Sequence, residues 1–261
     1  MAIIEKHKPG SFCWVELGTS SQIGAKQFYG PLFGWATNDF PMGPDEFYTI
    51  FRVDGQDTGG GYTLKPDMLA QGVPPHWILY IAVDSADAAA NKAAEAGATV
   101  VAPAFDVMSI GRMAVLKDPT GAVFCVWENK GHKGTGITAV PGTLCWADLS
   151  TPDQAAAAKF YADVFGWELT PGEDTSGYLH IKNGEDFIGG VPTAEQRAPD
   201  APPHWMLYFQ VESCDAATDQ AKQLGGRVYM EPFTMERVGR MSVVADPQGA
   251  VFSLFEPMPN A

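Results

Sequence analysis

The chain has 261 residues, of which 46% are hydrophobic and 18% are charged, a balance that is typical of folded globular proteins. Its 17 Lys and Arg against 31 Asp and Glu give a net charge of −14, which argues against nucleic acid and anionic membranes as partners. No apolar run approaches ~18 residues and the four cysteines form no Cys-x-x-Cys pair, so we expect a cytoplasmic protein without a membrane span, zinc motif or redox motif.

The predicted elements of the first half form the series strand, helix and about three strands, and this βαβββ series occurs twice. The first series is expected as a strand over 12–18, a helix over 20–35, and strands over 47–55 and 57–64. The second follows the sequence PPHW and is expected as a strand over 77–84, an Ala-rich helix over 85–98, and strands over 99–107, 112–118 and 122–128. Ser85 is the expected N-cap of the Ala-rich helix.

The second half of the chain repeats the first. Between 74–128 and 202–256, 26 of 55 aligned residues are identical, and the sequence FGW occurs at 33–35 and again at 165–167. Self-similarity of this length indicates a tandem duplication of a unit of ~120 residues, and so four βαβββ modules. We predict one domain over 10–130, a Gly- and Thr-rich linker over 131–140, and a second domain over 141–258.

The repeated PPHW sequence lies at 74–77 and 202–205, where one module leads into the next. Proline is tolerated at the start of a strand and breaks the structure before it. We therefore interpret PPHW as a rigid connection followed by a core Trp. His76 and His204 would then lie at the mouth of the surface that the strand lines.

A family resemblance comes from the sequences FYGPLFGW and FYADVFGW after the first strand of each unit and from the GRM…DPxGAVF endings. With the paired modules, they resemble the vicinal oxygen chelate superfamily, which covers glyoxalase I, bleomycin-resistance proteins and dioxygenases, and above all its tandem glyoxalase-like branch. The resemblance implies an α+β fold of two glyoxalase-like domains, each a curled mixed sheet with helices outside. In this family the cup-shaped sheet forms either within one unit or between units, and the sequence leaves both open.

The resemblance also implies a place for a divalent metal, held by His, Gln or Glu on the first and last strands of each module. Counted along this sequence, the three positions that align fall on Trp14, Ile78 and Cys125 and on their copies Trp146, Met206 and Ser253. Trp, Ile and Met supply no oxygen or imidazole ligand, and a single Cys does not make a site. We therefore expect neither a metal nor another cofactor.

Period-2 alternation predicts which side chains line each cup. Beside Ile78 and Met206, these are Trp14, Glu16, Tyr80, Cys125 and Trp127 in the first unit and Trp146, Asp148, Tyr208, Ser253 and Phe255 in the second. An aromatic surface of this kind suits a planar or apolar organic ligand held by a few polar anchors. Aromatic residues in a strand also fill cores, so both interpretations stay open.

Glu16 and Asp148 are the candidate catalytic residues, because each follows a Trp by two residues within an otherwise apolar strand. A carboxyl group in such a place is either paired or raised in pKa by burial, and a raised pKa suits a general base. Arg112 and Arg240, each in a GRM sequence, are the expected cup-facing partners, for substrate contact or for fixing the sheets. Nucleophilic catalysis by Cys125 would need a base such as His76.

Three functions are consistent with these residues. The first is a metal-independent protein that binds an aromatic or apolar metabolite, with lyase, isomerase or hydratase chemistry at Glu16 or Asp148. The second is a non-catalytic binding protein of the bleomycin-resistance type, which would depend on Trp14 more than on Glu16. The third is a metal-dependent glyoxalase or dioxygenase. The expected partner is a small molecule, and the chain is expected to be a monomer or a homodimer.

Overall fold

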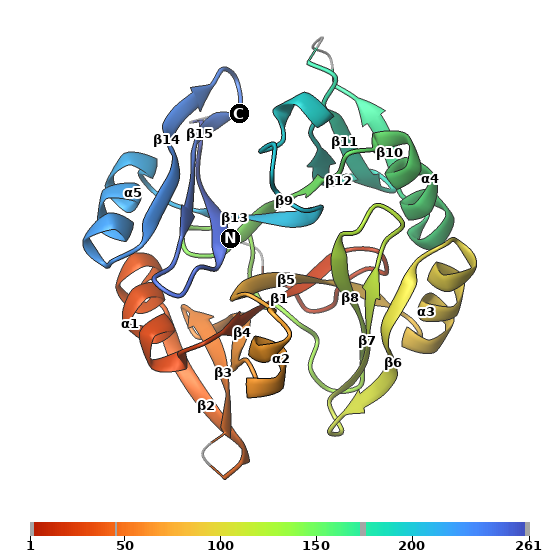
Figure 1. Ribbon diagram of the computed structural model, residues 1–261, viewed down its shortest axis with the longest axis horizontal. Coiled ribbons are helices and arrows are strands. Elements are labelled where there is room, and N and C mark those ends of the chain that lie inside the picture. The colour runs from red at the N-terminus through yellow and green to blue at the C-terminus, as the bar shows by residue number, and fades with distance from the viewer. Residues whose placement is uncertain (1–2, 45, 173–175, 259–261) are drawn as a thin grey trace.

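The computed structural model describes residues 3–44, 46–172 and 176–258, and its strands form two eight-stranded mixed sheets (Figure 1). One sheet uses strands from the first repeat alone and the other uses strands from the second repeat alone. The modules therefore pair within each repeat, which decides the question that the sequence left open. The predicted α+β fold of paired βαβββ modules is confirmed.

The first sheet has the strand order β2-β3-β4-β1-β5-β8-β7-β6. Its strands are β1 (Phe12–Thr19), β2 (Ala36–Gly43), β3 (Glu46–Val53), β4 (Gln56–Thr63), β5 (His76–Val83), β6 (Thr99–Val107), β7 (Gly111–Lys117) and β8 (Val123–Asn129). The helices of this repeat are α1 (Gln22–Phe33), α2 (Pro66–Ala70) and α3 (Ala86–Glu95). The two modules meet at the antiparallel pair β1–β5, where Trp14 lies opposite Tyr80.

The second sheet repeats this order as β10-β11-β12-β9-β13-β16-β15-β14. Its strands are β9 (Leu144–Ser150), β10 (Glu168–Pro171), β11 (Leu179–Asn183), β12 (Asp186–Val191), β13 (His204–Gln210), β14 (Arg227–Met235), β15 (Gly239–Ala245) and β16 (Val251–Pro257). The helices are α4 (Gln154–Phe165), a 3₁₀ turn η1 (Ala194–Gln196) and α5 (Cys214–Gln223). Trp146 lies opposite Tyr208 at the central β9–β13 pair.

Local sequence signals set the helix boundaries in both repeats. Ser21 begins α1 and Asp153 begins α4, because each side-chain oxygen accepts a hydrogen bond from the backbone N–H three residues later, at 3.1 Å and 2.9 Å. Gly34 and Gly166 end these helices in the left-handed conformation, with φ of 69° and 72°. Ser85 caps α3 as predicted. Within the described part of the chain, no helix combines the length and the apolar character that a membrane crossing needs.

Helices α1, α3, α4 and α5 pack on the outer faces of the sheets, and a single hydrophobic core joins the two repeats. Tyr29 of α1 donates a hydrogen bond to Asp246 of the second repeat at 3.0 Å, and Tyr161 of α4 donates to Asp118 of the first repeat at 2.9 Å. Figure 1 shows that helices of the two repeats also lie side by side, α1 beside α5 and α3 beside α4. Each repeat therefore completes the core of the other.

The PPHW sequence opens β5 and β13, and its tryptophans belong to this core. Trp77 and Trp205 are buried, and their indole N–H groups donate to the hydroxyl groups of Tyr29 and Tyr161 at 3.0 Å and 3.1 Å. The prediction of a strand start followed by a core Trp is confirmed.

Candidate functional site

The face of the first sheet that points away from α1 and α3, called here the inner face, carries a hydrophobic cluster of its own with a carboxyl group beside it. The cluster includes Trp14, Tyr80, Cys125 and Trp127. Glu16 accepts hydrogen bonds from the hydroxyl groups of Tyr48 at 2.7 Å (Oε1) and Tyr80 at 2.8 Å (Oε2). The indole N–H of Trp14 donates to the Tyr48 hydroxyl at 3.0 Å. The structure thus brings together the six residues, Ile78 among them, that alternation predicts for this unit.

The inner face of the second sheet carries the same arrangement around Asp148. Its Oδ1 accepts from the Tyr178 hydroxyl at 2.6 Å and from the indole N–H of Trp146 at 3.0 Å, and its Oδ2 accepts from the Tyr208 hydroxyl at 2.8 Å. A carboxyl group with two tyrosine hydroxyls and one tryptophan nearby therefore occurs once in each repeat, buried at Asp148 and partly buried at Glu16.

Burial is the main influence on both carboxyl groups. It raises the pKa of Asp148, and the hydrogen bonds from Tyr178, Tyr208 and Trp146 partly offset the rise. It likewise raises the pKa of Glu16, with opposing hydrogen bonds from Tyr48 and Tyr80. Each group is therefore easier to protonate than a free carboxyl group, which is the property that the general-base hypothesis needs.

The raised pKa of Asp148 predicts how stability depends on pH. The carboxyl group of Asp148 holds its proton more tightly in the folded chain than in the unfolded chain. The stability that this group contributes therefore falls as pH rises from its pKa in the unfolded chain, about 3.9, through its higher pKa in the folded chain. An Asn at position 148 does not titrate, so Asp148→Asn lacks this pH-dependent loss of stability. The free energy of unfolding of the variant minus that of the wild type should therefore increase between pH 3.5 and pH 7, as urea titrations would measure. A constant difference across that range would contradict the raised pKa.

Two glycines make room for the tyrosines that hold the carboxyl groups. A Cβ atom at Gly60 would lie 2.2 Å from the Tyr48 hydroxyl oxygen, and one at Gly190 would lie 1.8 Å from the Tyr178 hydroxyl oxygen. Both distances are far below contact, so any larger residue displaces the ring.

Gly190→Ala should therefore move Tyr178 away from Asp148 and destabilise the chain by about 1–3 kcal/mol, the usual cost of overpacking. Thermal unfolding measures the loss. The matched control is Gly30→Ala in helix α1, where the added Cβ meets nothing closer than 3.8 Å and a helical Ala is favoured. Equal stability of the two variants would show that the Tyr178 position is not constrained.

The expectation that Arg112 and Arg240 face the cup and pair with Glu16 and Asp148 is wrong. Arg112 makes two hydrogen bonds to Asp87 at the start of α3, at 2.7 Å and 2.9 Å. Arg240 bonds Asp215 in the first turn of α5 at 2.6 Å and 2.8 Å. The physical reason is strand parity, because the methionine after each arginine takes the inner side, as the packing of Met113 against the inner cluster shows.

Cys125 and Ser253 lie on the inner faces, next to Tyr80 and Tyr208 on the neighbouring strands. Cys125 is 1% exposed, and burial raises the pKa of its thiol far above the usual value, so it is held as a thiol and not as a thiolate nucleophile. His76, the base that such chemistry would need, is bonded through Nδ1 to the carbonyl of Pro74 at 2.8 Å. The second repeat uses His204 in the same way.

Equivalent rings of the two inner faces differ in exposure. Trp14 is 5% exposed and Trp127 is 7% exposed, whereas their copies Trp146 and Phe255 keep part of their surface accessible. Met206 is also partly exposed. At these matched positions the more accessible rings therefore belong to the second repeat.

Sequence reasoning missed Tyr48 and Tyr178, although both bond a predicted catalytic carboxyl group. Alternation along residues 47–55 places Tyr48 on the side of Ile50, which belongs to the inner cluster, so this signal was present. Tyr178 lies where the spacing between the repeats changes, so the alignment gave no partner for it.

The residues do not fit the divalent metal that the resemblance implies. Trp14 and Ile78 occupy two of the aligned positions and offer no ligand atom for such an ion. Both oxygens of the nearby Glu16 already accept hydrogen bonds from tyrosine hydroxyls. Across residues 3–44, 46–172 and 176–258, no group of three His, Cys, Asp or Glu side chains converges for metal binding.

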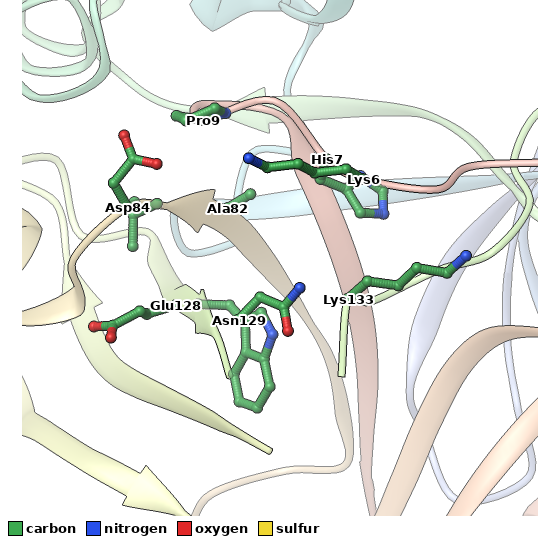
Figure 2. A pocket seen from close by; sticks show the side chains of 10 residues that line it. Lys6, His7, Pro9, Ala82, Asp84, Glu128, Asn129 and Lys133 are labelled. Carbon is green, nitrogen blue, oxygen red and sulfur yellow. The ribbon is translucent and has the colours of Figure 1, made fainter. Parts of the chain in front are cut away.

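A cavity of about 310 Å³ lies at the ends of β5 and β8, and neither Glu16 nor Asp148 lines it. Figure 2 shows Lys6, His7 and Lys133 on one side of it and Asp84 and Glu128 on the opposite side. Trp127 contributes to its lining, so the cavity borders the inner face of the first repeat.

Comparison with family models identifies both repeats as glyoxalase-like. Residues 143–254 match the Glyoxalase/Bleomycin resistance protein/Dioxygenase superfamily, and residues 22–127 match a glyoxalase-like domain.

Relatives are similar along almost the whole chain. CFP32 of Mycobacterium tuberculosis, which is provisionally named a glyoxylase, is 37% identical over 258 residues and 98% of each chain. The anthracycline biosynthesis protein DnrV of Streptomyces peucetius is 34% identical over 95% of this chain and 94% of its own. The Mn(II)-bound glyoxalase of Novosphingobium aromaticivorans shares the fold, with a TM-score of 0.66 at 16% identity over 97% of this chain and 83% of its own. The chain therefore belongs to the glyoxalase, bleomycin resistance protein and dioxygenase superfamily.

Proposed function

We propose that this chain binds a small planar or apolar organic molecule on the inner face of the second repeat and acts on it without a metal, with Asp148 as the group that transfers a proton. One observation carries the proposal. Asp148 is 7% exposed, lies in an aromatic surface and is held by three hydrogen-bond donors. A substrate with an acidic C–H or O–H group would meet there a base of raised pKa.

The surroundings of Asp148 suit a planar ligand. Trp146, Tyr178, His180 and Phe255 all keep part of their surface accessible. Aromatic pairs contribute about 0.5–1.5 kcal/mol beyond the burial of area, so several rings together supply binding energy without a charged anchor.

The tyrosines give the carboxyl group its balance between two protonation states. The hydroxyl groups of Tyr178 and Tyr208 stabilise the ionised form, whereas burial favours the protonated form. A group balanced in this way accepts a proton from a bound substrate and returns it to another atom, which is the requirement of an isomerase, lyase or hydratase step.

The name of one relative, DnrV, supports an aromatic ligand. DnrV is named for the biosynthesis of anthracyclines, which contain a planar polycyclic hydroxyquinone, and it is similar to this chain along nearly its whole length. We therefore expect polycyclic hydroxyquinones to be suitable first probes.

The proposal is tested by titrating the protein with 1,4-dihydroxyanthraquinone in chelator-treated buffer while tryptophan fluorescence is followed. We expect saturable binding that the chelator does not abolish, and loss of that binding in Trp146→Leu. Trp14→Leu is the matched control in the first repeat and should bind as the wild type does. Binding that requires an added divalent metal, or that survives in Trp146→Leu, would contradict the proposal.

Binding without chemistry is the second candidate function. It is supported by the three donors that already occupy Asp148, because a fully bonded carboxyl group also serves to fix the surface. Under this candidate Asp148→Asn binds the probe normally and the ligand is recovered unchanged after incubation. A metal-dependent glyoxalase or dioxygenase ranks third, because the residues at the aligned ligand positions do not fit a metal.

A further inference from the structure

Residues 131–136, called here the strap, lie across the end of the first inner face where β1 begins. The backbone N–H of Thr135 donates to the carbonyl of Cys13 at 2.8 Å. Two residues near the N-terminus bind the strap in turn, since the N–H of Ile4 donates to the carbonyl of Gly136 at 2.9 Å and the His7 ring bonds the carbonyl of Thr135 at 2.9 Å. The first part of the predicted linker, 131–140, is thus hydrogen-bonded to β1 through Thr135 and to the segment that precedes β1.

The strap places the ring of His132 against the inner-face tryptophans. The imidazole centroid lies 4.7 Å from Trp14 and 6.2 Å from Trp127, edge-on to both rings. The indole N–H of Trp127 donates to the backbone carbonyl of His132 at 2.8 Å. A small planar ring, held edge-on between two tryptophans, is the arrangement that a bound aromatic ligand would have.

The matched positions of the two repeats show what the strap covers. Cys13 is fully buried and bonds the carbonyl of Tyr80, whereas its copy Cys145 makes the equivalent bond to Tyr208 and stays partly exposed. The tryptophans follow the same division, as described above. Since Cys13 and Cys145 have the same residue type and equivalent hydrogen bonds, their difference in exposure comes from the strap, which covers the first inner face.

We infer that the first inner face is a binding site for a small planar ring which the chain fills with its own His132, so that a ligand from solution stacks in the second repeat alone. That a ligand binds in the second repeat rests on the proposed function. That His132 fills the first inner face does not, and the experiments on it use no ligand of the second repeat.

Gly134 provides a variant that lifts the strap. Its φ is +100°, and a Cβ atom there would lie 2.1 Å from the carbonyl oxygen of Cys13. Because this oxygen belongs to the backbone of β1, the strap has to shift instead. Gly131→Ala is the matched control within the same segment, because its added Cβ meets nothing closer than 3.5 Å.

Thiol alkylation with iodoacetamide, followed by peptide mass spectrometry, measures the covering directly. In the wild type we expect Cys145 to react at least about tenfold faster than Cys13, because the pKa of both thiols is raised by burial and access separates them. Gly134→Ala should raise the Cys13 rate toward that of Cys145, and Gly131→Ala should leave it unchanged. Equal rates in the wild type, or no change in Gly134→Ala, would overturn the inference.

Imidazole rescue tests the ring site itself. His132→Gly should lower Tm, and millimolar imidazole should restore it in a saturable way because the free ring fills the vacated place. His204→Gly is the control, since that ring is bonded to the carbonyl of Pro202 and belongs to no ring site. The inference would be overturned if imidazole changed the Tm of the wild type, His132→Gly and His204→Gly equally. It would also be overturned if His132→Gly folded but its Tm did not respond to imidazole.

Discussion

Asp148→Asn is expected to lower the rate of the proposed reaction by about 10²- to 10⁴-fold, the usual contribution of a general base, while the chain stays folded. The amide keeps the size of the carboxyl group but does not accept a proton at neutral pH. The surrounding donors, Tyr178 and Tyr208, can turn to accept from it, so the fold survives the change. Turnover of a substrate found by the binding screen, measured by the loss of its absorbance, checks the result.

Glu16→Gln is the matched control for this variant, because Glu16 has two tyrosine partners of its own in the first repeat. If the second repeat carries the reaction, Glu16→Gln should turn over substrate within about threefold of the wild type, which corresponds to less than 1 kcal/mol. Full activity in Asp148→Asn would show that this carboxyl group transfers no proton, and the binding protein would become the better account.

Tyr29→Ala is expected to have the largest effect on stability, about 3–5 kcal/mol, the range for removing a fully buried aromatic side chain. Tyr29 packs on Phe252 of the second repeat at 5.6 Å between ring centroids and bonds both Asp246 and Trp77. Because these contacts join the repeats, the two sheets should lose stability together and unfold in one calorimetric transition.

Tyr29→Phe separates the hydroxyl group from the ring. It leaves Asp246 and Trp77 without this partner and should cost about 1–3 kcal/mol, clearly less than the Ala variant. Two separate transitions in Tyr29→Ala, with only one of them shifted, would contradict the shared core and show that the repeats fold independently.

Much of the fold could be predicted because the repeats agree with each other. The helix caps, the core position of Trp77 and the inner side of Trp14 all follow from local signals that have one physical solution. The sidedness of Arg112 did not follow, because a Gly-Arg-Met sequence at a strand start satisfies both parities, and the packing of Met113 against the inner cluster decides between them.

The candidate site was predictable only in part. Glu16 and Asp148 stand out as carboxyl groups within apolar strands, but their tyrosine partners come from other strands through sheet order, which one sequence does not give. His132 lies in a segment whose Gly-rich composition is typical of a linker. Its role depends on a backbone bond between Thr135 and Cys13, more than a hundred residues apart, that no local pattern encodes.

Native mass spectrometry of the untagged protein with 1,4-dihydroxyanthraquinone would show directly whether one metal-free aromatic site in the second repeat binds the ligand. We expect a complex with one probe per chain and no metal ion, whether the protein is a monomer or a dimer. Trp146→Leu should not form this complex. A complex that carries a stoichiometric metal ion, or two probes per wild-type chain, would contradict this expectation.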